Sequence, residues 1–110
     1  MLDPARPVFD VTLLGLGTDG HTASLLPGDA LLNERKRWVA VVAHGRPEVR
    51  ITMTYPAIES SRNVAFLVTG KDKAAVFHAI RTGGSELPAA RVKPAGELIW
   101  FIDRAAAGAR

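Results

Sequence analysis

The 110 residues suffice for one domain with a modest core, and their composition, 47% hydrophobic and 23% charged, is globular rather than disordered. The formal net charge is only +3, and the Arg and Lys residues are scattered, so the sequence predicts no nucleic-acid partner. Only Arg35-Lys36-Arg37 form a run, which we expect to be a solvated face. The absence of cysteine excludes disulfides and thiolate metal sites, and the absence of an apolar span or a signal-peptide layout predicts a cytoplasmic protein without a membrane partner.

The first half of the chain predicts strands separated by short connections. The run from Phe9 to Leu16 is apolar on both faces, which is typical of a parallel strand covered on both sides. Two further strands are expected over residues 38–43 and 50–54. A short helix is then expected over residues 55–62, because Pro56 is tolerated in the first turn of a helix.

The second half predicts two more strands and two helices. Residues 63–68 form the clearest buried strand, and a helix over 71–81 follows, with apolar residues at helical spacing and a stop at Gly83-Gly84. A strand over 97–102 precedes a short alanine-rich helix that Asp103 can cap. Strands interleaved with helices predict an α/β, Rossmann-like three-layer fold with a mainly parallel sheet.

Residues 15–28 read GLGTDGHTASLLPG and begin with the G-x-G-x-x-G pattern of dinucleotide-binding turns. In that motif the third glycine opens a long helix, and an acidic residue ends the next strand about 20 residues later. Here the Pro-Gly pair at 27–28 stops any helix within two turns, and the next strand ends at His44. The sequence therefore disfavours nucleotide binding.

His21 is the first candidate for chemistry, because it lies in a loop expected beyond the carboxyl end of a strand, where α/β proteins bind ligands. A histidine titrates near neutrality and can act as a general base. Gly15, Gly17 and Gly20 would allow the backbone to approach a ligand closely. The alternative is an ordinary loop histidine, with Asp19 capping the short turn that follows.

A candidate anion site follows the buried strand, in the segment TGKDKA at 69–74. Free N–H groups at a helix N-terminus attract anions, and Lys71 and Lys73 add positive charge there; alternatively, one or both point to solvent. Arg50 stands at the start of a strand, where its guanidinium could reach a phosphate or simply be solvated.

Two other types of site are disfavoured. Ser24 follows His21 by three residues but lacks the G-x-S-x-G elbow of a serine hydrolase. A metal site at Asp19 and His21 would need further ligands, and the other histidines, His44 and His78, are distant in sequence without ligand spacing. We therefore predict no metal.

Three segments together resemble the glucosamine-6-phosphate isomerase/6-phosphogluconolactonase family, in its C-terminal portion. They are LLGLGTDGHTASLLPG at 13–28, RITMTYPAIESSRNVAFLVTGKDKA at 50–74 and LPAARVKPAGELIWFIDRAAA at 87–107. The isomerase branch shares the D-G-H core, whereas the continuation T-A-S-L-L-P-G favours the lactonase branch.

The resemblance implies hydrolysis of 6-phosphogluconolactone, a sugar phosphate, to 6-phosphogluconate in the oxidative pentose phosphate pathway, without a metal or organic cofactor. His21 matches the proposed general base of the family, and Asp19 matches the acid that orients it. Lys73 matches a lysine associated with the substrate phosphate, and Arg50 matches an arginine near the site. Gly17 and Gly20 belong to the same substrate-binding loop.

Family members also carry an N-terminal half, with a further strand and a Ser/Gly-rich phosphate loop, that has no counterpart here. We therefore expect residues 1–110 to form a single domain that is the C-terminal portion of a larger one, associated with the missing half or with further copies as a homo-oligomer. A sugar-phosphate isomerase or deaminase of the same family, or a non-catalytic truncated remnant that self-associates, are the alternatives.

Overall fold

A computed structural model of the chain describes residues 3, 5–43, 47–83 and 86–108. Two expected element ends, at His44 and Gly84, lie outside these residues. Within the described ranges the chain alternates strands with helices, and its main sheet is parallel. The predicted α/β class with a mainly parallel sheet is confirmed.

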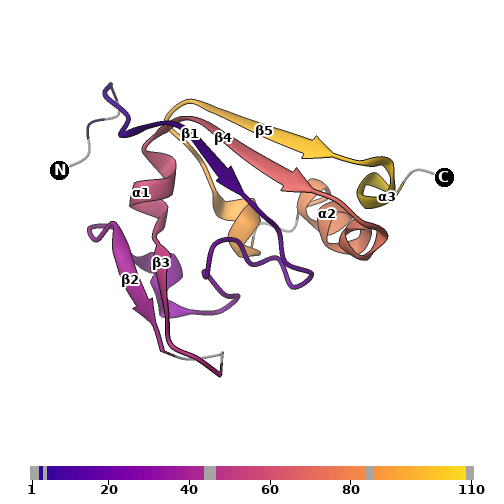
Figure 1. Ribbon diagram of the computed structural model, residues 1–110, viewed down its shortest axis with the longest axis horizontal. Helices are drawn as coiled ribbons and strands as arrows, with labels where there is room; N and C mark the ends of the chain where they lie inside the picture. The colour runs from indigo at the N-terminus through magenta and orange to yellow at the C-terminus, as the bar shows by residue number, and fades with distance from the viewer. Residues whose placement is uncertain (1–2, 4, 44–46, 84–85, 109–110) are drawn as a thin grey trace.

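Three parallel strands form the main sheet in the order β1-β4-β5 (Figure 1). They are β1 (Phe9–Leu14), β4 (Ser61–Val68) and β5 (Glu97–Ile102). Leu14 lies opposite Phe66, and Phe66 lies opposite Trp100. Because all three strands run in one direction, the loops that follow β1 and β4 leave the sheet at the same edge.

Strands β2 (Val39–Val42) and β3 (Arg50–Met53) form a separate antiparallel hairpin instead of joining this sheet. The connection over residues 43–49 is shorter than the dozen or more residues that a parallel crossover requires. The two strands were therefore predicted correctly as elements, while their short connection favours the antiparallel pairing.

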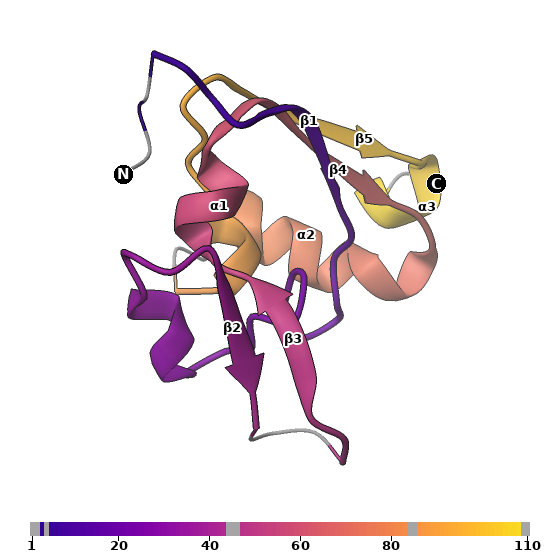
Figure 2. The same ribbon diagram turned by 60° about the vertical axis from the view of Figure 1, so that its left-hand side comes forward.

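The helices α1 and α2 lie on the same side of the main sheet (Figures 1 and 2). The α-helices are α1 (Tyr55–Glu59), α2 (Ala74–Arg81) and α3 (Arg104–Ala107), and the 3-10 helices are η1 (Ala30–Asn33), η2 (Lys71–Lys73) and η3 (Pro88–Arg91). Asp103 caps α3 as predicted, accepting a hydrogen bond from Ala106 N at 2.8 Å. Among the described helices, none has the length and apolar character needed to cross a membrane.

Several element ends differ from the predictions by one to three residues, and two of these differences have a clear reason in the packing. Strand β1 ends at Leu14, although the apolar run continues to Leu16, because Leu16 enters the core from the loop after the strand. The predicted helix over 55–62 ends at Glu59, since β4 already begins at Ser61, whose hydroxyl donates to Ile58 O at 2.7 Å.

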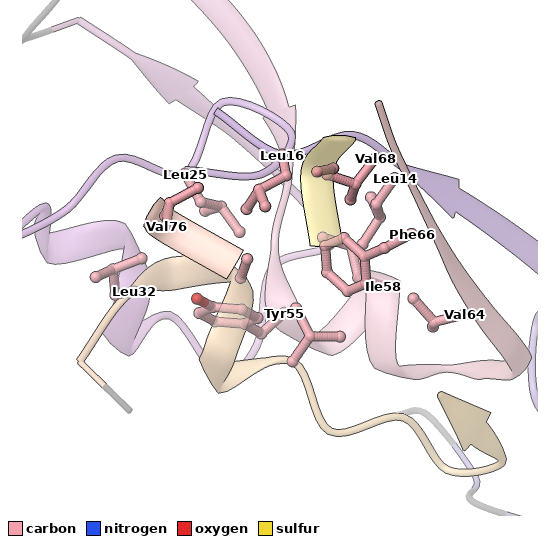
Figure 3. Close-up of a cluster of buried hydrophobic side chains, with 13 residues drawn as sticks. Leu14, Leu16, Leu25, Leu32, Tyr55, Ile58, Val64, Phe66, Val68 and Val76 are labelled. Atoms are coloured by element: carbon pink, nitrogen blue, oxygen red, sulfur yellow. The ribbon is translucent and has the colours of Figure 1, made fainter. Parts of the chain in front are cut away.

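The core lies between the main sheet and the helices (Figure 3). Phe66 is fully buried and stacks on Trp100, with ring centroids 4.1 Å apart. Tyr55, at the start of α1, is also buried, and its hydroxyl donates to Pro88 O at 2.6 Å. Burying a large apolar side chain contributes about 1.5–3 kcal/mol, so these contacts fix the sheet and its loops in place.

The opposite face of the main sheet is apolar and exposed. Side chains alternate along a strand, so the neighbours of the core residues point away from it. Val11, Leu13, Leu67 and Phe101 occupy this face, with exposed fractions between 51% and 62%. The sequence predicted a strand covered on both sides, and the described residues supply the cover on one side only.

Candidate active site

The loop that follows β1 is held by hydrogen bonds within itself. Gly17 N donates to His21 O at 2.9 Å, and Gly20 N donates to Gly17 O at 2.9 Å. The hydroxyl of Thr22 donates to Gly15 O at 2.9 Å. These bonds close a tight turn around His21. They explain why no helix begins at Gly20, as it would in a dinucleotide-binding turn with the same G-x-G-x-x-G pattern.

The same loop is tied to the rest of the molecule on two sides. Ser24 N donates to the hydroxyl of Thr52 on β3 at 3.0 Å, and Ala89 N, on η3, donates to Gly20 O at 3.0 Å. Leu25 is fully buried. The imidazole is therefore presented by an anchored loop, which positions a reacting group better than a free one.

Asp19 and His21 form a hydrogen-bonded pair. The distance from His21 Nδ1 to Asp19 Oδ1 is 2.6 Å, and the same oxygen accepts from His21 N at 3.0 Å. A carboxylate only accepts hydrogen bonds, so in the neutral imidazole Nδ1 carries the hydrogen and Nε2 keeps its lone pair. Because the side chain of His21 is 30% exposed, Nε2 can take a proton from a bound water molecule.

The pKa of the Asp19 carboxyl lies below its ordinary value of 3.8. Partial burial raises this pKa, but the hydrogen bonds from the backbone N–H and the imidazole of His21 together lower it by more, so the net shift is downward. Asp19 is therefore ionised at neutral pH and can hold the imidazole in the orientation described above.

The lowered pKa of Asp19 predicts a pH dependence of stability. A carboxyl with a depressed folded-state pKa stabilises the fold above its unfolded-state pKa, and this contribution is lost as the pH falls through the folded-state value. We expect Asp19→Asn to flatten the acid limb of the free energy of unfolding below about pH 4, measured by urea unfolding at each pH. Glu86→Gln, at an exposed position, is the control; an acid limb changed equally by both variants would refute the assignment.

Both predicted site glycines stand where a side chain would not fit. A Cβ atom on Gly17 would lie 2.1 Å from Cε1 and Nδ1 of His21. Gly20 has φ of +89°, and its Cβ would lie 2.9 Å from side-chain atoms of Leu87. Gly17 thus makes room for the hydrogen-bonded pair of Asp19 and His21.

The turn after β4 provides the second part of the candidate site. Gly70 has φ of +101°, and Lys71–Lys73 form η2 before α2 begins at Ala74. Lys73 is partly buried, and within the described residues it forms no ion pair. An ammonium group without a carboxylate partner, at the sheet edge shared with His21, can receive an anionic substrate group.

Arg50 is the first residue of β3, and Glu48 accepts from its Nε at 2.7 Å. Arg50 shares a hairpin face with Thr52, which contacts Ser24 of the His21 loop. Arg50 is thus connected to the loop through the hairpin, while Asp19 and His21 are in direct contact.

The contact between Ser24 and the buried Thr52 was not expected from the sequence, because it joins residues from two separate elements. Its only sequence signal is the alternation in RITMT, which places Thr52 and Thr54 on one face. Among the described residues, no three His, Cys, Asp or Glu side chains are grouped closely enough to hold a metal ion.

Comparison with known proteins identifies the family of the chain. A family model described as glucosamine-6-phosphate isomerases/6-phosphogluconolactonase matches residues 1–100. The chain is 48% identical over 103 residues to 6-phosphogluconolactonase 3, chloroplastic, of Arabidopsis thaliana and 47% identical over 106 residues to the 6-phosphogluconolactonase of Homo sapiens. These matches cover 91% and 92% of this chain but 32% and 41% of the two relatives, so the chain spans less than half their length.

A solved structure agrees with the sequence comparison. The 6-phosphogluconolactonase of Thermotoga maritima superposes with a TM-score of 0.74 and 31% identity, over 86% of this chain and 43% of that one. The family match includes the loop of Asp19 and His21, the hairpin with Arg50 and the turn with Lys73. This chain therefore belongs to the glucosamine-6-phosphate isomerase/6-phosphogluconolactonase family.

Proposed function

We propose that the protein to which this chain belongs hydrolyses 6-phosphogluconolactone to 6-phosphogluconate in the oxidative pentose phosphate pathway. The observation that carries the proposal is the 2.6 Å contact between Asp19 and His21 Nδ1, on a loop at the carboxyl edge of a parallel sheet. The names of the Arabidopsis and human relatives support the choice of substrate.

In the proposed reaction, His21 Nε2 removes a proton from a water molecule while the water oxygen attacks the lactone carbonyl carbon. The tetrahedral intermediate then breaks its bond to the ring oxygen, and the imidazolium returns the proton to that oxygen as it leaves as a hydroxyl group. Asp19 holds the ring and stabilises the imidazolium charge. The product is a carboxylic acid, which ionises at neutral pH and releases one proton.

The remaining candidates are assigned to binding. Lys73 receives the substrate phosphate, which does not react. Arg50 forms an ion pair with Glu48 and is assigned a secondary contact from the hairpin. Gly17 and Gly20 are assigned to the substrate-binding loop that presents His21, and their own N–H and C=O groups are bonded within that loop or to Ala89. A shared site is supported by the parallel pairing of β1 and β4, which brings their following loops to one edge.

Lys73→Ala is expected to raise KM for the lactone about tenfold or more, with a smaller change in kcat. A hydrogen bond to a charged group contributes about 1.5–3 kcal/mol, and a contact to the unreactive phosphate stabilises ground state and transition state alike. Steady-state kinetics of Lys73→Ala and Lys71→Ala provide the comparison, because Lys71 is exposed in the same turn. Equal KM values for the two variants would remove Lys73 from the site.

A substrate panel tests the function itself. The lactone and glucosamine 6-phosphate are supplied separately to the longest form of the protein that contains this chain, and acid and ammonia release are measured. Hydrolysis of the lactone alone is expected; turnover of the amino sugar alone would assign the isomerase or deaminase branch instead. We expect little turnover from the 110-residue chain by itself. Without the phosphate loop of the N-terminal half the substrate is positioned less firmly, and this raises the activation barrier of hydrolysis.

The alternative of a non-catalytic, self-associating remnant is favoured by one feature, the exposed apolar sheet face with Val11, Leu13, Leu67 and Phe101. This alternative predicts that neither the lactone nor the amino sugar is turned over in the panel. It also predicts that the apparent mass in sedimentation increases with protein concentration. A compact monomer in dilute solution would count against it.

A cytoplasmic location is proposed on the absence of cysteine, which fits a reducing compartment. The Arabidopsis relative is named chloroplastic, so cell fractionation with an organelle marker is the relevant test.

A further inference from the structure

A cavity with charged side chains in its lining lies outside the elements assigned to the reaction. Its volume is about 400 Å³, and it is lined by Arg35, Tyr55, Glu59, Ala90, Arg91 and Lys93. These residues come from the segment after η1, from α1, and from η3 and the residues that follow it. None of them belongs to the loop after β1 or to the turn after β4.

Two arginine side chains converge at this cavity. Leu32 O accepts from Arg35 Nη1 and from Arg91 Nη2, each at 3.2 Å. The guanidinium of Arg91 also lies over the ring of Tyr55, 5.7 Å from its centroid. Like charges this close repel each other, and an anion bound between them would offset the repulsion.

More cationic than anionic side chains line the cavity. Among the described residues, Arg35, Arg91 and Lys93 form no ion pair with a carboxylate. Glu59 is the only carboxylate among the lining residues, and its Oε2 accepts from the backbone of Lys93 at 2.7 Å. Burial raises the pKa of Glu59 above its ordinary value, whereas the hydrogen bond from Lys93 N and the charges of Arg35, Lys93 and Arg91 act in the opposite direction.

We propose that this cavity binds a phosphate group, separately from the site at His21. Guanidinium groups bind phosphate oxygens through paired N–H donors, and both arginines retain N–H groups beyond those that contact Leu32. The ammonium of Lys93 supplies a third charge. Glu59 Oε1 is available to accept a hydrogen bond from a hydroxyl group.

The size of the cavity favours a phosphate ester over the free ion. A volume of about 400 Å³ falls within the range of roughly 300–1,000 Å³ of small-molecule sites and exceeds what one phosphate fills. The ligand class is therefore a phosphate monoester of a small polyhydroxy compound. Since Ala89 N bonds to Gly20 O, η3 connects this cavity to the His21 loop.

The test is a titration of the isotopically labelled chain with inorganic phosphate and with glycerol 3-phosphate, at constant ionic strength, followed by NMR. Both are expected to shift the backbone signals of Ala90, Arg91 and Lys93. Tighter binding of glycerol 3-phosphate assigns the ester as ligand, and equal affinity assigns the phosphate group alone. Shifts confined to Lys71–Lys73 would overturn the proposal.

Matched variants test the arginines. Arg35→Gln and Arg91→Gln are expected to weaken binding of glycerol 3-phosphate about tenfold or more, whereas Arg37→Gln, the same change at an exposed neighbour, leaves it within about twofold. His21→Ala should leave binding unchanged. Equal affinities for the three arginine variants would show that the cavity is not the phosphate site.

Discussion

His21→Ala is expected to lower kcat for lactone hydrolysis by about 10²- to 10⁴-fold, the range typical of a lost general base. The remaining site would still bind the lactone through its phosphate, so KM should change much less. The rate is measured as acid release at constant pH, after subtraction of spontaneous hydrolysis, in the longest active form of the protein that contains this chain.

The matched control is His78→Ala, which removes the same side chain from an exposed position on α2. Its kcat should equal that of the unmodified protein. If His21→Ala keeps full activity, the catalytic role of the Asp19–His21 pair is excluded.

Gly17→Ala is expected to reduce kcat about 100-fold while the fold stays intact. The added methyl group would stand 2.1 Å from the imidazole of His21, so the ring must turn away and break its contact with Asp19. A displacement of about 1 Å in a reacting group can cost this factor. The atoms displaced belong to the end of a flexible side chain, and the stability of the protein is therefore little affected.

Gly15→Ala serves as the control, because no atom lies within 4 Å of the Cβ position at Gly15. Both variants are compared for kcat and for Tm by thermal unfolding. Similar kcat values for the two would show that the space beside the imidazole is not required, and a large loss of Tm in Gly17→Ala alone would show a structural role for Gly17 instead.

Elements marked by local signals were predictable from the sequence. The buried strand β4, the strand β5 and the cap at Asp103 depend on short-range patterns, and all three are present. The antiparallel pairing of β2 and β3 was not predicted, although the short connection over residues 43–49 already indicates it in the sequence. The predicted strand reached Leu16, two residues too far, because an apolar residue in the sequence can be buried in a strand or in a packed loop.

The candidate site shows the same division. Asp19 and His21 are two residues apart, so their pairing follows from a local turn that the sequence indicates. The proposed phosphate cavity depends on Arg35 and Arg91, which are distant in sequence and meet through hydrogen bonds to one carbonyl oxygen, that of Leu32. From the sequence, Arg35 was expected on a solvated face; the residue is exposed as predicted, and its guanidinium also donates to Leu32 O, a contact that the sequence did not indicate.

Binding of 6-phosphogluconate tests directly whether the loops after β1 and β4 form one substrate site. The labelled chain is titrated with this product of the proposed reaction, and NMR signals are followed at His21 and at Lys73. We predict that both sets shift together and saturate with a single Kd, which increases about tenfold or more in Lys73→Ala. Separate Kd values for the two loops, or shifts at Lys73 with none at His21, would contradict a shared site for the sugar phosphate.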